Sequence, residues 1–283
     1  RGRGVLTAER EVTVGDDVLR AERAVVVAVG TTPAMPPIPG LADAAAWSNR
    51  EITTAEEVPG RLAVIGGGAI GVEMAQAWRT LGSEVVLLEV APRILGPEEE
   101  FASAEVAQGL RDAGVDVRAG VSITHVTRDG ERGAVRLSLA DGGEVHADEL
   151  LVAAGRRPQT EGLGVELVGG EPGRPLAVDD TLRVPGHEWL FVVGDANGRA
   201  LLTHMGKHQA RIAADVILGG DARLRPSAEP PPRVTFSDPQ VAAVGHTLAS
   251  ASHDGTLRSG KVTFCVSAMA EMISFIVRTP SSR

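Results

Sequence analysis

The segment from Arg61 to Glu89 constrains the fold of this chain more than any other. It reads RLAVIGGGAIGVEMAQAWRTLGSEVVLLE: an apolar run, a Gly-x-Gly-x-x-Gly turn, an amphipathic run and a second apolar run that ends in an acid. Branched apolar residues without alternation are typical of a strand covered on both faces, and apolar residues at helical spacing indicate a helix. This order of strand, turn, helix and strand is the context in which the glycine pattern binds a dinucleotide.

The loop between the first strand and the helix is predicted to hold the phosphates. Gly66 permits a tight turn, Gly68 lets a pyrophosphate approach the backbone, and Gly71 lets the helix lie close to the strand. Free N–H groups and the positive end of the helix dipole attract an anion there without a basic side chain. The other loop residues expected at this site are Gly67, Ala69 and Ile70.

Glu89, the acid that ends the second strand, indicates which nucleotide is bound. A carboxylate there accepts hydrogen bonds from both ribose hydroxyls of the adenosine and would repel a 2′-phosphate. We therefore expect NAD rather than NADP. Neighbouring glycines also occur in flexible loops, but the strand, the helix, the second strand and the acid all stand at the required spacing, which disfavours that interpretation.

Composition excludes several classes of function. A net charge of −9 and 3% aromatic residues, with no Tyr, argue against nucleic acid as a partner. No apolar run approaches the roughly 18 to 20 residues of a membrane span, and the first residues lack the apolar core of a signal peptide, so we expect a cytoplasmic protein. The single cysteine, Cys265, excludes an internal disulfide and is expected to be inert. The seven histidines show no metal-ligand spacing.

The length of 283 residues, of which 43% are hydrophobic, predicts two or three domains. Turn residues and periodicity place further elements on either side of the nucleotide segment. They are, in chain order, strands at 11–14 and 25–29, a proline-rich connector after Gly30, a helix at 98–113 with Gly114 beyond its end, a strand from Val115, and a hairpin around 141–143 that closes a unit near Ala147.

A second region also delivers polar residues to the end of a strand. The buried strand at 190–193 leads to Gly194 and Asp195, and a helix follows at 205–218. Ligands of open α/β sheets lie at the carboxyl ends of the strands. An acid between a strand and a helix is equally explained as a helix cap, so Asp195 has two interpretations of equal weight.

The pair Arg156 and Arg157 follows another buried strand and Gly155. These guanidinium groups would be suitable for supporting nucleotide phosphates. A basic pair at a strand end is more often a solvated ion-pair site, which is the interpretation we favour from the sequence.

The motifs occur in a specific order: AVG with following prolines, GGGAIGVE, LLVAAGRRP and VVGDANGRALLTH. In this order the chain resembles the pyridine nucleotide-disulfide oxidoreductases over roughly Leu6 to Gly245. The resemblance implies an α/β fold in which a Rossmann-like NAD-binding domain is inserted into an FAD-binding domain of the same general type, followed by the start of an α+β dimerisation domain. The implied boundaries are 1–58 and 148–225 for the FAD-binding domain, 59–147 for the NAD-binding domain, and 226–283 for a linker and a truncated dimerisation domain.

The resemblance assigns the glycine loop to the NAD pyrophosphate and Glu89 to the NAD ribose. It also implies that Ile123 packs on the adenosine and that the backbone of Gly155 approaches NAD. Glu73 matches a glutamate near the nicotinamide that usually pairs with a lysine, and no such lysine is identifiable here. Glu73 is as well explained as an acid in the first turns of a helix.

On the FAD side, the resemblance implies that Asp195, preceded by Gly194, binds the ribityl chain. Thr203 matches a position whose backbone touches the flavin side, and Gly30 matches the glycine that closes a strand of the FAD-binding domain. His204 corresponds to a structural histidine near the flavin pocket. The resemblance assigns no catalytic and no metal-binding residue in this chain.

The chain also departs from the family pattern. It contains no second Gly-x-Gly-x-x-Gly loop for FAD, no Cys-x-x-x-x-Cys redox pair and no His-Pro-x-x-x-Glu motif, which supplies an acid/base histidine across the family's homodimer. FSDPQVAAVGH resembles the opening of the dimerisation domain, after a proline-rich linker at 226–232.

Two hypotheses about function follow from these matches and departures. In the first, the chain represents a flavoenzyme that passes hydride from NADH to FAD and onward to a disulfide, quinone or similar acceptor. In the second, which the absent starting Met and the unfamiliar ending motivate, it is a truncated, catalytically inactive product that binds NAD at most. A homodimer is expected for the full-length family member.

Overall fold

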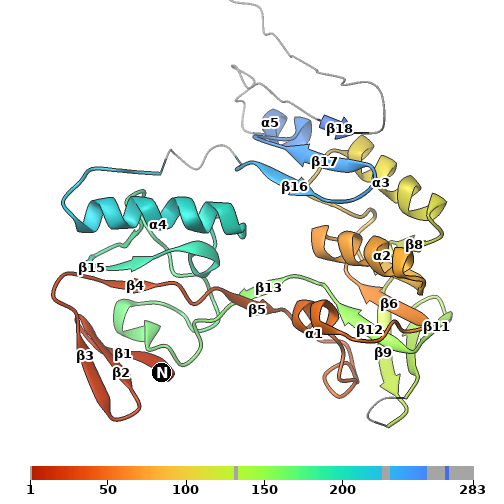
Figure 1. Ribbon diagram of the computed structural model, residues 1–283, viewed down its shortest axis with the longest axis horizontal. Helices are drawn as coiled ribbons and strands as arrows, with labels where there is room; N and C mark the ends of the chain where they lie inside the picture. The colour runs from red at the N-terminus through yellow and green to blue at the C-terminus, as the bar shows by residue number, and fades with distance from the viewer. Residues whose placement is uncertain (1, 131–132, 225–229, 254–264, 268–283) are drawn as a thin grey trace, which may run out of the picture. The chain divides into compact units, whose positions relative to one another are not determined.

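The computed structural model describes residues 2–130, 133–224, 230–253 and 265–267 (Figure 1). The fold is α/β, and the chain divides into two compact units. Unit 1 comprises Arg1–Thr32 and Arg156–Pro231, and unit 2 comprises Pro33–Gly155 and Pro232–Arg283. The boundaries at residues 58, 147 and 225 are expected for FAD-binding and NAD-binding domains. These two compact units do not test them, so the boundaries stay predictions.

The parallel sheet of unit 2 is built around the glycine-containing segment. Its strand order is β12-β6-β7-β8, and every pairing within it is parallel. Helix α2 (Ala69–Leu81) follows β6 and ends at Gly82, whose φ of 112° is left-handed, while α3 (Glu100–Asp112) follows β7. The strands are β6 (Arg61–Ile65), β7 (Glu84–Glu89), β8 (Asp116–Ala119) and β12 (Glu149–Val152).

Strand β6 is buried on both faces, as its apolar run predicts. Leu62 and Val64 pack in one core with side chains of α2 and α3. Ala63 and Ile65 pack in a second core, with side chains of the antiparallel sheet β11-β10-β9. Side chains alternate across a strand, so a strand without polar residues needs cover on each face. The antiparallel sheet consists of β9 (Ile123–Arg128), β10 (Val135–Leu139) and β11 (Glu144–Ala147).

Three short strands after residue 232 form a small antiparallel sheet within unit 2, with the strand order β16-β17-β18. The Arg233 guanidinium donates two hydrogen bonds to the buried carboxylate of Glu98, at 2.6 and 3.0 Å. This ion pair ties the new sheet to the segment that precedes α3. The elements are β16 (Arg233–Thr235), β17 (Gln240–Ala243), β18 (Cys265–Ser267) and α5 (Leu248–His253).

Unit 1 combines an antiparallel meander with a small mixed sheet. In the mixed sheet, β15 (His187–Val192) pairs in parallel with β4 (Val25–Val27) and antiparallel with β14 (Arg183–Val184). Helix α4 (Thr203–Ile217) packs on this sheet, since its buried residues share a core with Phe191 of β15 (Figure 1). The other elements are β1 (Gly4–Ala8), β2 (Glu11–Val14), β3 (Asp17–Arg20), the pair β5 (Thr31–Pro33) and β13 (Arg156–Pro158), and the 3₁₀ helices η1 (Val165–Val168) and η2 (Gly194–Asn197).

Several predicted bounds differ from those observed. The helix expected at 205–218 begins at Thr203, and the strand expected at 25–29 stops at Val27, where its pairing with β15 ends. The sequence patterns above do not predict helix α1 (Asn49–Thr54), although Ser48 and Glu51 form a capping box at its start. Linker residues 226–229 and the tail after Ser267 lie outside the described residues. Over the ranges that the structure covers, no helix has both the length and the apolar character of a membrane span.

Candidate dinucleotide-binding sites

Two glycines, Gly66 in the β6–α2 loop and Gly71 in the first turn of α2, are required by close contacts. Gly66 has a φ of +108°, and a Cβ at this position would lie 2.5 Å from the carbonyl oxygen of Ala153. Its N–H donates to the carbonyl of Leu88 at 2.8 Å, which joins the loop to β7. A Cβ on Gly71 would lie 1.8 Å from the carbonyl oxygen of Gly66. Side chains are therefore excluded at both positions, and α2 packs directly against the loop.

Gly68 differs from them because its surroundings are open. It is the N-cap of α2 with a φ of −73°, and no side chain caps the helix there. No atom lies within 4 Å of the place where a Cβ would project. The amino end of α2 is thus left without a side-chain cap beside an open space, which fits the approach of a pyrophosphate.

The Glu89 side chain is fixed at the same loop. Its carboxylate accepts hydrogen bonds from the Gly67 N–H at 2.5 Å and from the Ala91 N–H at 2.7 Å. The residue is half-buried at the end of β7. An ionised carboxylate offers about four lone-pair sites, so these two bonds leave acceptor capacity for ribose hydroxyls.

The other residues predicted for NAD lie near the ends of these strands or at the start of α2. Gly155 follows β12, has a φ of +119°, and accepts a hydrogen bond from the Ala34 N–H at 2.9 Å. Ile123 is the first residue of β9 and is half-buried. Ala69 and Ile70 begin α2, the first exposed and the second half-buried.

Glu73 has a role that the sequence does not reveal. Glu73 is the fifth residue of α2 and lies just beyond the first turn, which contains no acid, so the helix dipole acts on it only weakly. Its carboxylate accepts a hydrogen bond from the Phe236 N–H at 2.8 Å, and the Gln76 side-chain oxygen accepts one from the Asp238 N–H at 2.7 Å. Both contacts hold the turn between β16 and β17 on α2. The assignment of Glu73 to the nicotinamide stays a prediction.

In unit 1, three side chains meet at the end of β15. The Asp195 carboxylate accepts a hydrogen bond from the Thr31 hydroxyl at 2.9 Å, and Nε of Arg156 lies 4.0 Å from the same oxygen. Arg156 Nε also donates to the Thr31 hydroxyl at 2.6 Å, and its Nη2 donates to the Thr31 carbonyl at 2.9 Å. We call these three residues the Asp195 cluster. Asp195 and Arg156 are each 25% exposed, so the cluster is accessible but partly shielded from water.

The structure bears on two alternatives that the sequence leaves open. Asp195 does not cap α4, whose N-cap is Leu202 and lacks a side-chain cap. Arg157 forms the exposed ion pair expected of it, with Glu161 at 3.1 Å. Arg156 forms an ion pair as well, with Asp195 at 4.0 Å, but it also donates to Thr31 and is only 25% exposed. A role for Arg156 toward nucleotide phosphates stays a prediction.

Two of the remaining residues predicted for FAD are chain neighbours of this cluster, and the third begins α4. Gly30 and Gly194, with φ of 70° and 69°, directly precede Thr31 and Asp195 along the chain. Thr203 is the first residue of α4 and is exposed. The backbone therefore takes left-handed turns immediately before two members of the cluster.

Sequence reasoning does not single out Thr31, and it does not connect Arg156 with Thr31 or with Asp195. Thr31 is 164 positions from Asp195 and 125 positions from Arg156, so no local spacing connects them. The available signal was that each follows a glycine at the end of a strand-like run, as Asp195 does. Strands β5 and β13 pair with each other, and this pairing brings Thr31 and Arg156 together.

Comparison with known proteins identifies the fold. The family model described as pyridine nucleotide-disulphide oxidoreductase matches residues 1–211. The chain belongs to this family. The matched range includes the β6–α2 loop, Glu89 and the Asp195 cluster, and it confirms the resemblance inferred from the motifs. The family is one of oxidoreductases that use FAD and a pyridine nucleotide, so the match also confirms these two cofactors at the level of the family.

Individual members of the family are similar over most of the chain. Mercuric reductase of Shigella flexneri is 36% identical over 248 residues, which cover 85% of this chain and 42% of the relative. Dihydrolipoyl dehydrogenase of Pseudomonas aeruginosa is 36% identical over 209 residues, which cover 74% of this chain and 44% of the relative. The chain spans about half the length of the curated relatives it matches.

Solved structures show the same relationship. The HOCl-induced flavoprotein disulfide reductase RclA of Escherichia coli, in its Cu(II) complex, matches with a TM-score of 0.80 at 27% identity. The match covers 92% of this chain and 58% of RclA. The family fold therefore extends over nearly the whole chain.

Proposed function

We propose that this chain is part of an FAD-dependent oxidoreductase that passes hydride from NADH to flavin and on to a disulfide, quinone or similar acceptor. The observation that carries the proposal is that each unit places one acid at the carboxyl end of a parallel strand. Glu89 follows β7 in unit 2, and Asp195 follows β15 in unit 1. This is the location of nucleotide ligands in open α/β sheets.

In unit 2, the residues of the chain would bind and orient NAD. The amino end of α2, beside Gly68, would hold the pyrophosphate through backbone N–H groups. Glu89 would accept hydrogen bonds from the ribose hydroxyls, and its negative charge would oppose the 2′-phosphate of NADP. Gly155, Ile123 and Ile70 complete the proposed site. Holding the nucleotide in one orientation lowers the entropy cost of bringing the reacting atoms together.

In unit 1, Asp195 would accept a hydrogen bond from a ribityl hydroxyl of FAD. Thr31 and Arg156 hold the carboxylate in place, so its orientation does not depend on the ligand. The amino end of α4, at Thr203, would offer N–H groups and the positive end of the helix dipole to the flavin. Bound FAD supplies the redox chemistry, and the protein supplies position and electrostatics.

The proposal extends to the setting of the protein. A single cysteine among 283 residues is consistent with a reducing compartment, and we propose the cytoplasm. A homodimer and a small-molecule or disulfide acceptor are proposed from the family assignment.

An absorbance spectrum tests this function directly. The purified 283-residue chain and the longest protein that contains it would each be mixed with excess FAD, desalted and then given NADH without oxygen. Retained flavin bands that bleach with NADH, and bleach more slowly with equal NADPH, are the expected result for the protein that contains the chain. Flavin that is retained but not reduced by either nucleotide would contradict the proposal. Nucleotide binding without any retained flavin in either sample would support the NAD-binding remnant instead.

A further inference from the structure

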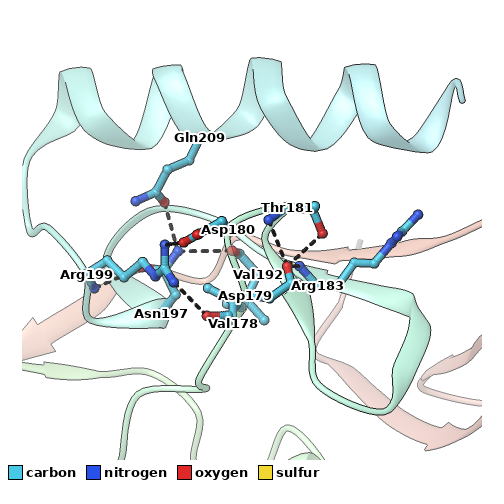
Figure 2. A network of polar contacts seen from close by, with 9 residues as sticks. All are labelled: Val178, Asp179, Asp180, Thr181, Arg183, Val192, Asn197, Arg199 and Gln209. Atoms are coloured by element: carbon cyan, nitrogen blue, oxygen red, sulfur yellow. Dashed lines mark hydrogen bonds and ion pairs between the residues drawn. The ribbon is translucent and has the colours of Figure 1, made fainter. Parts of the chain in front are cut away.

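Gln209, in the middle of α4, is a buried amide that bonds to the turn carrying Asp195. The side chain is 0% exposed. Its Oε1 accepts two hydrogen bonds, from the Gly194 N–H at 2.7 Å and from the Asn197 Nδ2 at 2.8 Å. Figure 2 shows Gln209 reaching from α4 toward Asn197. One side-chain oxygen therefore connects the helix to both ends of η2.

Asn197 extends this connection into the strand. Its Nδ2 also donates to the Val192 carbonyl at 3.0 Å, and its Oδ1 accepts a hydrogen bond from the Arg199 N–H at 3.0 Å (Figure 2). Asn197 is 5% exposed. Because hydrogen bonds in a buried environment are little screened, two such amides define one conformation for the turn that contains Asp195.

The helix also packs closely on this turn. A Cβ on Gly206 would lie 3.4 Å from the Cα of Gly194, an ordinary van der Waals distance, so α4 lies against the turn at this position. Gly206 and Gln209 are three positions apart in α4, and residues at this spacing share one face of a helix. The contact and the two hydrogen bonds thus act on the same side of α4.

The other polar atom of Gln209 shows which part of the amide matters. Among the described residues, Gln209 Nε2 is buried and has no hydrogen-bond partner. An unmade hydrogen bond in the interior is costly. The amide remains there because its oxygen is used twice, so the acceptor is the functional part of this side chain.

We propose that Gln209 is a positioning residue that couples the Asp195 carboxylate to the amino end of α4. This inference rests on the proposed function, in which both elements hold the flavin. Thr203 and Gln209 are separated by six helical residues, or about 9 Å along the axis. Anchoring Gln209 at Gly194 fixes the first turns of α4 against the Asp195 turn. The flavin then meets a site whose two sides already stand at the correct separation, which reduces the cost of binding.

The test compares two variants in the protein that contains this chain, purified with its flavin. Gln209→Met keeps the approximate length of the side chain and removes the acceptor. Gln209→Glu keeps two acceptor atoms and removes the orphan donor. Gln108→Met, on the exposed face of α3 in unit 2, is the matched control. The flavin dissociation rate is measured well below the unfolding midpoint of every variant, so that a loss of stability alone does not change it.

We expect Gln209→Met to release flavin about tenfold faster, because only part of the free energy lost with its two hydrogen bonds is transmitted to the flavin site. Gln209→Glu should stay closer to the wild type, and Gln108→Met should equal it. Flavin release from Gln209→Met at the wild-type rate would overturn the inference. If Gln209→Met does not fold, Gln209→Glu decides: retention of flavin supports the acceptor role, and loss of flavin from the folded variant contradicts it.

Amide hydrogen exchange separates this inference from the proposed function. If the wild-type protein holds no flavin, the proposed function fails, but the coupling remains measurable. Gln209→Met should then raise exchange both at Gly194 and in the first turn of α4. Faster exchange at Gly194 alone would contradict the coupling, because the helix would not be responding.

Discussion

The two units prepare a nucleotide site by different means. In unit 2, the β6–α2 loop is shaped by the backbone: Gly66 and Gly71 leave no room for side chains, and Gly68 leaves a space. In unit 1, the Asp195 cluster is shaped by side chains from distant parts of the chain. A backbone site depends on which residues lack a side chain, whereas a side-chain site depends on which residues meet after folding.

The difference explains how each site is expected to fail. A substitution in the glycine loop introduces atoms where the fold leaves no space, so it affects stability and binding together. A substitution in the Asp195 cluster removes one or two hydrogen bonds from a network without adding atoms, so it loosens the ligand more than the fold. The predictions below test this contrast.

Gly71→Ala should have the largest effect. Its Cβ would lie 1.8 Å from the Gly66 carbonyl oxygen, so α2 would have to move away from β6. We expect the free energy of unfolding to fall by about 3 kcal/mol. Urea unfolding followed by circular dichroism measures this, and unchanged stability would show that α2 does not pack on the loop as described.

Gly68→Ala separates binding from folding at the same loop. No atom lies within 4 Å of the added Cβ, so stability should change by less than about 1 kcal/mol. NAD affinity, measured by calorimetry, should fall by about tenfold or more, because the methyl group occupies the space proposed for the pyrophosphate. Full NAD affinity in this variant would contradict that placement.

Thr31→Val tests the side-chain site. The hydroxyl donates to Asp195 and accepts from Arg156, and its removal leaves both partners with one bond fewer. We expect flavin affinity to fall by about tenfold, with NAD affinity unchanged. Thr53→Val, an exposed change of the same chemistry in α1 of unit 2, is the control. A parallel loss of NAD affinity would remove the distinction between the two units.

Asp179→Asn should have the smallest effect, and it depends on pH. Burial opposes ionisation of Asp179, but the Thr181 hydroxyl and the N–H groups of Arg183 and Thr181 outweigh it and lower the pKa of the carboxyl (Figure 2). A lowered folded-state pKa adds stability above the ordinary value of about 3.9, and this stability is lost as the pH falls through the folded-state pKa. At pH 6, the wild type should therefore have the larger free energy of unfolding. The two values should converge as the pH falls toward 2. A constant difference over this range would contradict the assignment.

Most of the fold and half of the site could be predicted from the sequence. The β6–α2–β7 order, the double burial of β6 and the cap at Gly82 follow from local rules about periodicity and glycine. Glu89 could be placed because it lies a fixed distance after the glycines. Thr31 could not be placed, and Arg156 could not be joined to it, because the pairing of β5 with β13 brings them together and no local pattern encodes that pairing.

Helix α2 also makes polar contacts that its amphipathic sequence pattern does not predict. Glu73 and Gln76 are polar residues on the helix, and their sequence suits a solvated face. Instead, they accept hydrogen bonds from the backbone N–H groups of Phe236 and Asp238, which are far along the chain. Sequence periodicity distinguishes apolar from polar positions, but it does not distinguish a polar side chain in water from one that holds another segment.

The buried ion pair between Arg233 and Glu98 joins the sheet that begins with β16 to the segment before α3. Removal of that sheet would leave the Glu98 carboxylate, 7% exposed, without its guanidinium. Glu73 and Gln76 would lose their backbone partners at the same moment. The two parts should therefore melt in one transition, although more than a hundred residues separate them along the chain.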